Sequence, residues 1–530
     1  MSFDLGNLLP LFVAGPMGVA FIVSLAARLR RERVLDVIAV VAALSLFTLT
    51  VLLLLSAGGT QVRWVGGWGN LSSMKLLGVA LHCDGLTRLL LAVINLIAFL
   101  VVIYATDYIK RYTSPGLFYS LLFLMIAGMN GVVLAGDLFN LYVFLELASL
   151  CSYALVAFGT RARQLEASFK YLVLGSLSTL LVLTGIVLLY SFTGTLNLAQ
   201  MTREMSAAAA AHGGKLPAAA FLALGFFIAG FGLKSAMVPF HAWLPDAHPA
   251  APAPVSAMLS GVLIKAVGAY ALVRVVFNVF GANVAVANIL MVLGSISMVV
   301  GVVCAFGQKD LKRLLAYSSI SQMGYVILAF GIACDVLARK GPDFRAVAEL
   351  AAFGGLFHLV NHASFKSLLF LSAGAIEHAT GTRNIEELGG ISKRMPVTGW
   401  CLRIAALSIS GVPPFSGFWS KLVIIIAAVQ AGHWGLGALA VAVSLLTLTL
   451  FVKVQRSVLG GEPTAKTAGA REAPAGMALP MAALACVVVA VGLLGFLCPP
   501  FRHAVFDPAR DVVVRGDEVL RSVDIGSLQK

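Results

Sequence analysis

Four lysines lie in stretches of the sequence that are otherwise apolar. They are Lys234, Lys265, Lys366 and Lys421. The eighteen residues 216–233 contain no Asp, Glu, Lys or Arg, and the next such residue after Lys234 is Asp246. A lysine in such surroundings has to pair with an acid, face water or lie in a protein interior, because an isolated charge in the membrane is costly.

One of these lysines and one glutamate fall near the middle of their apolar stretches. Lys265 follows Pro254 by eleven residues and Glu146 follows Asp137 by nine, which is about 16 Å and about 13 Å along a helix. Both depths are near the midplane of an apolar layer about 30 Å thick. An ionisable group there costs at least about 2.5 kcal/mol. Ion pairs that only join helices are the structural alternative, but such pairs add little over apolar residues.

The chemistry that suits these residue types is proton transfer. Burial favours the neutral form of a lysine and of a glutamate, whereas pairing between them favours the charged forms. A lysine that alternately gains and loses a carboxylate partner therefore alternately binds and releases a proton.

The composition shows what must position these residues. The chain has 530 residues, of which 59% are hydrophobic and 12% charged, and its mean hydropathy is +0.94. Soluble domains carry about 25% charged residues, so the sequence predicts an all-α polytopic membrane protein. The formal net charge of +14 would suit nucleic acid, but its distribution argues against that partner.

Fourteen apolar stretches have the length of a membrane-spanning helix. Prolines interrupt the seventh, at Pro239 and Pro245, and the twelfth, at Pro413 and Pro414, so both should be broken helices. Two Lys-bearing broken spans five apart predict two inverted five-helix repeats, spans 4–8 and 9–13. The expected units are residues 1–110, 111–280, 281–459 and 460–530.

The basic residues sort by side of the membrane. Loops after odd-numbered spans hold eighteen Lys and Arg, and loops after even-numbered spans hold seven. The positive-inside rule then predicts a multi-pass protein of the cytoplasmic (inner) membrane with both termini on the non-cytoplasmic side. The basic loops are also expected to meet anionic lipid. The N-terminal MSFDLGNLLP has no basic residue before the first apolar run, so we expect no cleavable signal peptide.

The remaining charged residues have simpler interpretations. Arg88, Lys170, Arg274 and Arg403 lie near predicted span ends, where long side chains reach the interface. Near other span ends, helix capping is the expected role of Asp84, Asp137 and Asp310.

No pattern indicates a metal or a cofactor. His241 and His248 with Asp246 fall short of a metal-ligand set. The seven cysteines show no CxxC spacing, and no dinucleotide or phosphate-binding loop stands in a suitable context. We therefore expect no cofactor on this chain, and any redox chemistry would belong to partner subunits.

Several motifs resemble one family over most of the chain, from about Asp84 to about Val429. They are GDLFNLYVFLELASLCSYALV around Glu146, LEASFKYLVLGS, GLKSAMVPFHAWLPDAHPAAPAPVSAMLSGVLIKAVGAY, DLKRLLAYSSISQMGY, FHLVNHASFKSLLFLSAG and PPFSGFWSK. The sequence is similar to the antiporter-like, proton-translocating membrane subunits of respiratory complex I, membrane-bound hydrogenases and Mrp sodium/proton antiporters. Its motifs are most like those of the D-type Mrp proteins.

The resemblance implies roles for individual residues. Glu146 and Lys234 resemble the family's functional ion pair, and Lys265 its central relay lysine. His358, His362 and Lys366 resemble the polar stretch that leads to Lys421, the terminal lysine of the second half-channel. Some relatives carry glutamate at that last place.

The resemblance also implies the function class. We expect a proton-conducting subunit of a multisubunit cation/proton antiporter, with sodium exchange left open and other membrane subunits as partners. The alternative is a proton-pumping subunit of a redox-driven NADH:quinone oxidoreductase or membrane-bound hydrogenase. In either case the chain is not expected to be catalytic alone.

Overall fold

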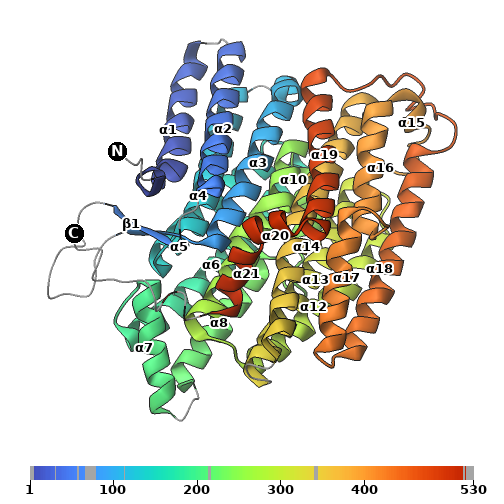
Figure 1. The fold of residues 1–530 in the computed structure, drawn as a ribbon. Helices are drawn as coiled ribbons and strands as arrows, with labels where there is room; N and C mark the ends of the chain where they lie inside the picture. Colours follow the sequence, from blue (N-terminus) through green and yellow to red (C-terminus); the bar gives the residue numbers. More distant parts are fainter. Residues whose placement is uncertain are drawn as a thin grey trace.

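The computed structural model describes residues 5–29, 32–56, 59–65, 79–112, 114–212, 216–339 and 344–516, together with residues 518 and 520. Long helices make up nearly all of the described chain and run roughly parallel to one another (Figure 1). Apolar runs of 20 residues or more favour helices in a membrane because a helix satisfies its own backbone polar groups.

The N-terminal part contributes three long helices and a pair of short strands. Its elements are η1 (Leu5–Leu8), α1 (Leu11–Ala26), η2 (Ala27–Leu29), α2 (Glu32–Leu55), β1 (Gln61–Val65), β2 (Val79–Cys83), α3 (Gly85–Tyr108) and η3 (Ile109–Arg111). The two strands pair antiparallel, with Gln61 opposite Cys83 and Val65 opposite Val79. The strands are therefore a local addition to a helical fold.

The middle of the chain contains the first broken helix. Its elements are α4 (Pro115–Leu134), α5 (Leu138–Val156), α6 (Ala162–Thr193), α7 (Leu198–Ala211), α8 (Ala218–Lys234), α9 (Leu244–Ala250), α10 (Ala253–Met258), η4 (Leu259–Tyr270), α11 (Ala271–Val273) and η5 (Arg274–Phe280). The segments η4 and η5 are π-helical, so α10 to η5 form one continuous but wider helix. Irregular helices of this kind are frequent at functional sites.

The C-terminal half contains the second broken helix. Its elements are α12 (Val284–Phe306), α13 (Leu311–Arg339), α14 (Arg345–Thr380), α15 (Ile391–Arg394), α16 (Pro396–Ser410), α17 (Ser416–Gln430), α18 (Trp434–Val454), η7 (Gln455–Leu459), α19 (Ala475–Leu497), α20 (Pro499–Val505) and α21 (Asp507–Val514). The long helix α14 packs against α13, α16, α17, α19 and η4. It is therefore the central helix of this half.

The predicted class of fold is confirmed. In the described part of the chain, eleven helices are long and apolar enough to cross a membrane, and α8 and α17 are shorter apolar helices. Together with α14 and the pair α16–α17, they follow the predicted order of fourteen spans. The limits of the two repeats stay a prediction.

Both predicted helix breaks are present. Turns separate α8 from α9 at residues 235–243 and α16 from α17 at residues 411–415, and each break contains a cis X-Pro bond, Val238–Pro239 and Pro413–Pro414. Ala236 in the first break has a φ of 55°, which non-glycine residues seldom adopt. Each break places a lysine close to interrupted backbone, Lys234 at the end of α8 and Lys421 in the second turn of α17.

Burial separates a central core from a periphery. The helix from Ala253 to Phe280 is completely buried in its most apolar window and α13 is 94% buried, whereas α1 is 33% and α2 is 28% buried. The outer helices present apolar faces, as lipid-facing helices do. The completely buried helix is the one that carries Lys265.

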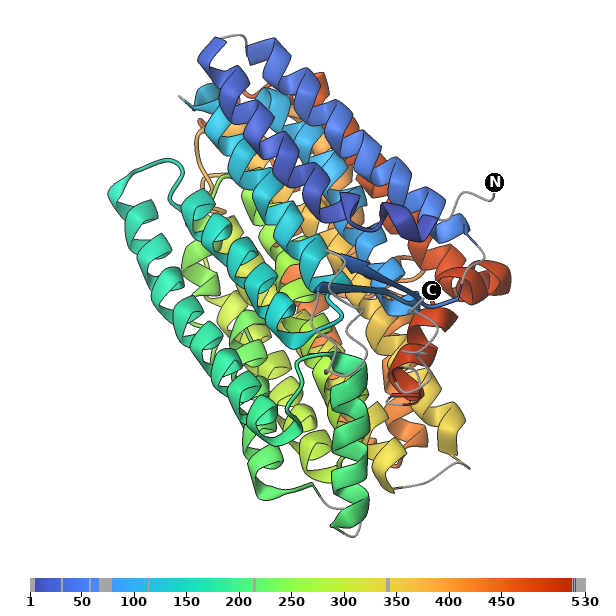
Figure 2. The same cartoon turned by 90° about the vertical axis from the view of Figure 1, so that its left-hand side faces the viewer.

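One end of the bundle is closed by the strands and the C-terminal helices, and we call it the hairpin end. Strand β2 continues beside the α4–α5 connection, where the Gly136 amide donates to the Ala80 carbonyl over 2.8 Å. Helix α21 packs against α3, α14 and η5. Figure 2 shows the strand pair and the red C-terminal helices on the same side of the molecule, near the N-terminus.

Candidate proton-transfer site

Glu146 and Lys234 lie beside one another but do not form an ion pair in the structure. Lys234 is 5% exposed, and its Nζ donates to Ser149 Oγ over 2.7 Å and to Tyr153 OH over 3.2 Å. Ser149 and Tyr153 follow Glu146 by three and seven residues on α5, so all three share one helix face. Glu146 Oε2 is buried and has no hydrogen-bond partner in the described residues. Lysine and carboxylate are thus within reach of pairing but apart.

The break after Lys234 is held against the helix that carries Lys265. At Gly268 the backbone of Ser235 comes so close that an added Cβ would lie 2.7 Å from the Ser235 amide nitrogen. Only glycine fits such an approach. On the other side of the break, the Trp243 indole donates to the Leu233 carbonyl over 3.0 Å, which fixes the return of the chain.

Lys265 is completely buried in η4 and contacts no carboxylate among the described residues. Its Nζ donates to the carbonyl oxygen of Ser260, five residues earlier. The Ser260 hydroxyl is 2.8 Å from the Ser319 hydroxyl of α13. Lys265 thus contacts the backbone of a serine whose side chain reaches α13, and the two hydroxyls can both donate and accept protons.

Lys366 lies on α14 opposite the same part of α13. Its Nζ donates to Ser318 Oγ over 2.6 Å and to the Leu315 carbonyl over 2.7 Å. Ser318 is adjacent in sequence to Ser319, which contacts Ser260. The two serines of α13 therefore stand between Lys265 and Lys366.

Lys265, the serines of α13 and Lys366 begin a row of buried polar side chains. His362 and His358 continue this row along α14, one and two turns before Lys366. Both are completely buried, and their rings are stacked with centroids 6.4 Å apart. His358 Nδ1 is 2.9 Å from Ser420 Oγ. His358 Nε2 and both ring nitrogens of His362 have no partner in the described part of the chain.

Lys421 lies next to Ser420 on α17, and the row ends there. It is 2% exposed, and its Nζ donates to the Ile409 carbonyl over 2.8 Å and to Ser444 Oγ over 3.4 Å. The ammonium also lies 5.2 Å from the centroid of the Tyr325 ring, which in turn is 5.5 Å from the His358 ring. Tyr325 therefore bridges the histidines and the last lysine.

Two further buried polar residues belong to the surroundings of this row: Gln322 was not singled out from the sequence, and His248 was considered there only as a metal ligand. Gln322 on α13 is completely buried, and both its amide atoms are unpartnered within the described residues. His248 of α9 is also completely buried, stacks on Phe370 with centroids 4.5 Å apart, and has both nitrogens unpartnered there. The spacing from Glu146 could have indicated Ser149 and Tyr153, because positions i+3 and i+7 share a helix face.

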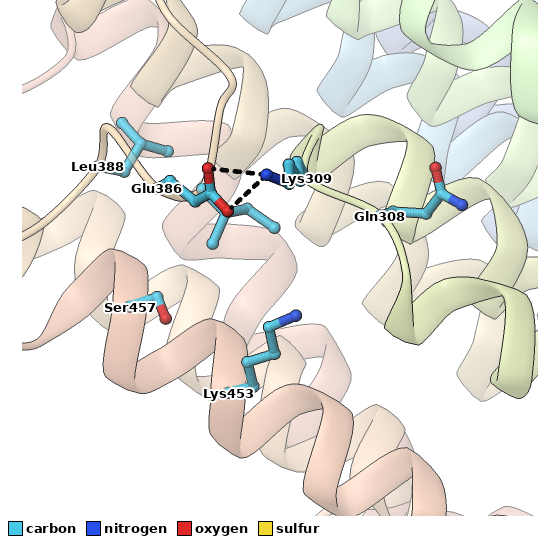
Figure 3. Close-up of a pocket in the computed structure, with 7 residues that line it drawn as sticks. Gln308, Lys309, Glu386, Leu388, Lys453 and Ser457 are labelled. Carbon is cyan, nitrogen blue, oxygen red and sulfur yellow. Dashed lines mark hydrogen bonds and ion pairs between the residues drawn. The ribbon is translucent and has the colours of Figure 1, made fainter.

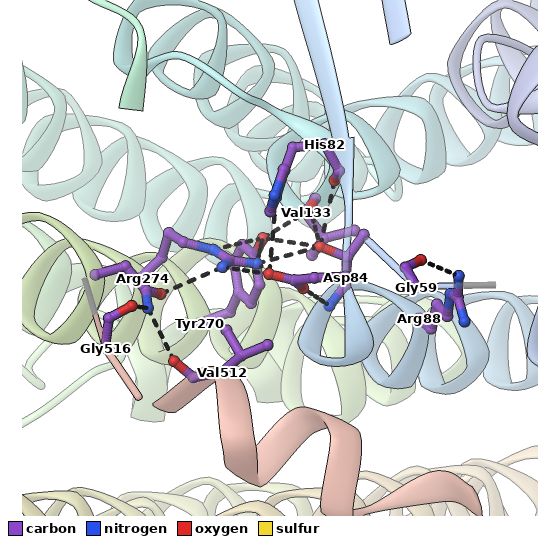
Figure 4. Close-up of polar contacts among 11 residues, drawn as sticks. Gly59, His82, Asp84, Arg88, Val133, Tyr270, Arg274, Val512 and Gly516 are labelled. Atoms are coloured by element: carbon purple, nitrogen blue, oxygen red, sulfur yellow. Dashed lines mark hydrogen bonds and ion pairs between the residues drawn. The ribbon is translucent and has the colours of Figure 1, made fainter. Parts of the chain in front are cut away.

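Arg274 does not reach the interface, so that expectation is wrong. It is 1% exposed and forms a bidentate pair with Asp84, at 2.7 Å and 3.0 Å (Figure 4). Asp84 also caps α3 by accepting from the Thr87 amide over 2.9 Å. Burial alone would raise the pKa of Asp84, but the Arg274 guanidinium outweighs it and holds this pKa well below its usual range. The nearby His82 is kept neutral because burial lowers its pKa to about 4.

The other charged residues divide between expectation and correction. Capping is confirmed for Asp137 and Asp310, which accept from the amides of Asn140 and Arg313 over 2.7 Å and 3.1 Å. Lys312 is one of the eighteen basic residues counted above in loops after odd-numbered spans. In the structure it lies in the first turn of α13, is 1% exposed and pairs with Glu377 over 3.0 Å. The fold of neighbouring helices buries it.

One surface pocket of about 290 Å³ lies apart from this row. Gln308, Lys309, Glu386, Lys453 and Ser457 line it (Figure 3). Lys309 is 3.0 Å from Glu386 and its side chain is 71% exposed. The pocket contains none of the buried lysines or histidines described above, so it is separate from the candidate site.

The fold and this row of buried Lys, His, Ser and Tyr side chains define a class, the antiporter-like subunits of multisubunit membrane complexes. Residues 135–447 match the family described as NADH:quinone oxidoreductase/Mrp antiporter, TM. The chain belongs to this family.

Individual relatives match over almost the whole length. The chain is 36% identical to NADH-quinone oxidoreductase subunit N of Desulforudis audaxviator, over 92% of this chain and 94% of that protein. It is 30% identical to the D-type component of the Na(+)/H(+) antiporter of Alkalihalophilus pseudofirmus, over 97% and 99%. A chain of the Mrp complex from Dietzia sp. DQ12-45-1b superposes with a TM-score of 0.86 at 27% identity, over 98% and 100%.

Proposed function

We propose that this chain conducts protons as a subunit of a multisubunit cation/proton antiporter. The proton moves along the row formed by Glu146, Lys234, Lys265, Lys366, His362, His358 and Lys421. The observation that supports this is the state of the lysines: four are buried, and their hydrogen-bond partners among the described residues are hydroxyl and carbonyl groups. Buried cations without acids are costly in a purely structural role.

The order of steps follows the order in which the residues are arranged from α8 to α17. A proton is taken up near Lys234 and Lys265, passes the serines of α13 to Lys366, continues along the α14 histidines and leaves through Lys421. Serine and neutral histidine can each accept a proton on one side and release one on the other.

Glu146 controls the first step in this proposal. When its carboxylate pairs with Lys234, the charged lysine is favoured, and when the pair opens, the neutral lysine is favoured. The structure has Lys234 on Ser149 and Tyr153, one and two turns along α5 from Glu146. A small movement of the lysine side chain would therefore switch its partner.

The direct test is coupled transport in everted membrane vesicles that contain the whole complex. Lys234→Ala should lower sodium-dependent proton movement by about 100-fold or more, the lower bound for loss of a positioned proton-transfer group. Lys466→Ala is the matched control because that lysine is exposed and lies outside the surface pocket. Full transport by Lys234→Ala, with normal amounts of the complex in the membrane, would refute the proposal.

A redox-driven pump is the second candidate. It is supported by the 36% identity to an NADH-quinone oxidoreductase subunit N. Mass spectrometry of the complex purified from native membranes distinguishes the two functions. Iron–sulfur or flavin subunits would favour the redox-driven pump, whereas small hydrophobic partners alone would favour the antiporter.

We also propose that both termini lie outside the cytoplasm and that the basic loops contact anionic lipid. The support is the charge bias of the loops and, for lipid, the two lysines of the surface pocket, Lys309 and Lys453. In intact cells, an impermeant thiol reagent should label Glu204→Cys in α7 but not Lys393→Cys in α15. The reverse labelling would contradict the proposed topology.

Native mass spectrometry tests the lipid contact. It should show less bound phosphatidylglycerol after Lys309→Gln and Lys453→Gln, and unchanged bound lipid would contradict this proposal.

A further inference from the structure

The cluster around Arg274 satisfies every hydrogen of the guanidinium. Nη1 donates to Asp84 and Asn278, Nη2 to Asp84, Thr87 and Tyr270, and Nε to Tyr270, over distances of 2.7 to 3.3 Å. The Tyr270 hydroxyl itself donates to the Val133 carbonyl over 2.7 Å. Each N–H group of the guanidinium therefore has an acceptor. By contrast, several buried polar atoms near the buried lysines and histidines have no partner in the described residues.

The cluster also joins parts of the chain that are far apart in sequence. Asp84 connects it to β2 and α3, and Val133 to α4. Asn278 of η5 donates to the carbonyls of Val512 and Gly516, over 2.9 Å and 2.7 Å, and its own carbonyl accepts from Thr202 of α7 over 2.9 Å. Figure 4 shows α21 approaching the ion pair from the side opposite to His82. The cluster therefore fastens the elements that cover the hairpin end.

The Asp84–Arg274 cluster lies between Lys265 and the hairpin end of the same helix. Arg274 follows Lys265 by nine residues on the same helix, at most about 14 Å along the axis. A proton on Lys265 that moved toward the hairpin end would meet this cluster. An arginine does not release its proton, and both oxygens of Asp84 are already bound by the guanidinium. The hydroxyls of Thr87 and Tyr270 accept from the guanidinium and donate to a backbone carbonyl. Because their hydrogen-bonding sites are occupied in this way, the cluster offers a proton from Lys265 no free acceptor.

We propose that the Asp84–Arg274 cluster is a proton-tight closure at the hairpin end of the Lys265 helix. Asp84 and Arg274 are positioning residues: they hold β2, α3 and the C-terminal segment in place, so that a proton on Lys265 leaves only along the row toward Lys421. The inference rests on the proposed function, because a closure matters only if Lys265 carries protons.

The experiment measures passive proton leak in liposomes that contain the purified complex, with no substrate or sodium gradient. A potassium diffusion potential drives protons inward, and a trapped pH dye reports them. Asp84→Asn leaves Arg274 charged and unpaired, and an unpaired charge at this depth draws water. We expect the proton leak to rise at least ten-fold, whereas potassium release without ionophore stays at the wild-type level.

Two further variants test whether the leak follows the proposed route. Adding Lys265→Met to Asp84→Asn should return the leak to within two-fold of wild type, because the carrier is gone. The apolar pair Asp84→Leu with Arg274→Met should also stay tight, since apolar residues can replace a buried ion pair. If Asp84→Asn does not assemble, Asn278→Ala, which releases Val512 and Gly516, should raise the leak at least three-fold.

The outcomes separate the closure from the proposed function. A wild-type leak in assembled Asp84→Asn or Asn278→Ala overturns the closure, as does a leak that persists without Lys265. A parallel rise in potassium release would show a general packing defect and also overturns it. The proposed function fails on a different reading, namely coupled transport that does not depend on Lys234.

Discussion

Lys265 and Arg274 are nine residues apart on one completely buried helix, but their hydrogen-bond and ion-pair partners differ in kind. Lys265 has a neighbouring carbonyl and a serine relay, with no acid in the described part of the chain. Arg274 has an acid held by two hydrogen bonds and no hydrogen left to donate. The first environment allows the charge to change, and the second fixes it.

The difference teaches that burial alone does not mark a functional cation. A more informative sign is that buried polar atoms near the cation lack hydrogen-bond partners. Such atoms cost free energy, so their presence needs an explanation such as a functional role. The unpartnered atoms of His248, Gln322 and His362 lie on the helices around Lys265 and Lys366. In the elements around Arg274, His82 Nε2, Arg88 Nε and Gln61 Oε1 also have no partner among the described residues. The guanidinium of Arg274 and the carboxylate that it binds are nevertheless fully hydrogen-bonded.

The largest expected effect concerns stability. Arg274→Met leaves Asp84 charged and buried, and breaking a buried pair in this way costs about 3–5 kcal/mol. Lys265→Met removes a buried charge that has no acid among the described residues and should stabilise the protein or leave it unchanged. Thermal aggregation of the detergent-solubilised complex measures both, and equal melting of the two variants would break the comparison.

A smaller effect is expected within the proton-transfer row. His362→Leu removes two ring nitrogens that have no partner among the described residues, so the complex should assemble with unchanged stability. Coupled transport should fall about 10- to 100-fold, because the relay between Lys366 and His358 is interrupted. The control is His503→Leu in α20, which is exposed; equal transport by both variants would remove His362 from the path.

The smallest effect is the response of the hairpin end to pH, which should be absent between pH 8 and pH 5. Asp84 has a lowered pKa in the folded chain, so its stabilising effect is present above the unfolded carboxyl value and is lost only as the pH falls through the lower, folded value. Its neighbour His82 stays neutral down to about pH 4 because burial lowers its pKa. Hydrogen exchange of the Thr87 amide should therefore keep its protection from pH 8 to pH 5, after correction for intrinsic rates. A loss of protection near pH 6 would show that the cluster titrates.

Much of the fold could be predicted because membrane helices are specified locally. A run of apolar residues sets each span, and Pro239, Pro245, Pro413 and Pro414 indicated the two breaks. The π-helical turns of η4 and η5 could not be predicted, since no proline or glycine pattern distinguishes them from ordinary helix.

The site could be predicted only in part. Deep lysines stand out against apolar sequence, so the burial of Lys234, Lys265, Lys366 and Lys421 could be predicted, whereas their partners come largely from other helices. Arg274 and Lys312 were misplaced for the same reason: whether a basic residue near a span end meets water depends on what covers that end. Here β2, α21 and Glu377 cover them.

The close approach at Gly268 has a mechanical consequence. The Ser235 backbone and its hydroxyl lie directly against the Gly268 backbone there. If the turn at residues 235–243 shifts, the helix that carries Lys265 has to shift with it, because the two are in direct contact at Gly268. Under the proposed function, proton uptake at Lys234 would then be coupled to a displacement of Lys265, and a methyl group added at position 268 would disturb that coupling.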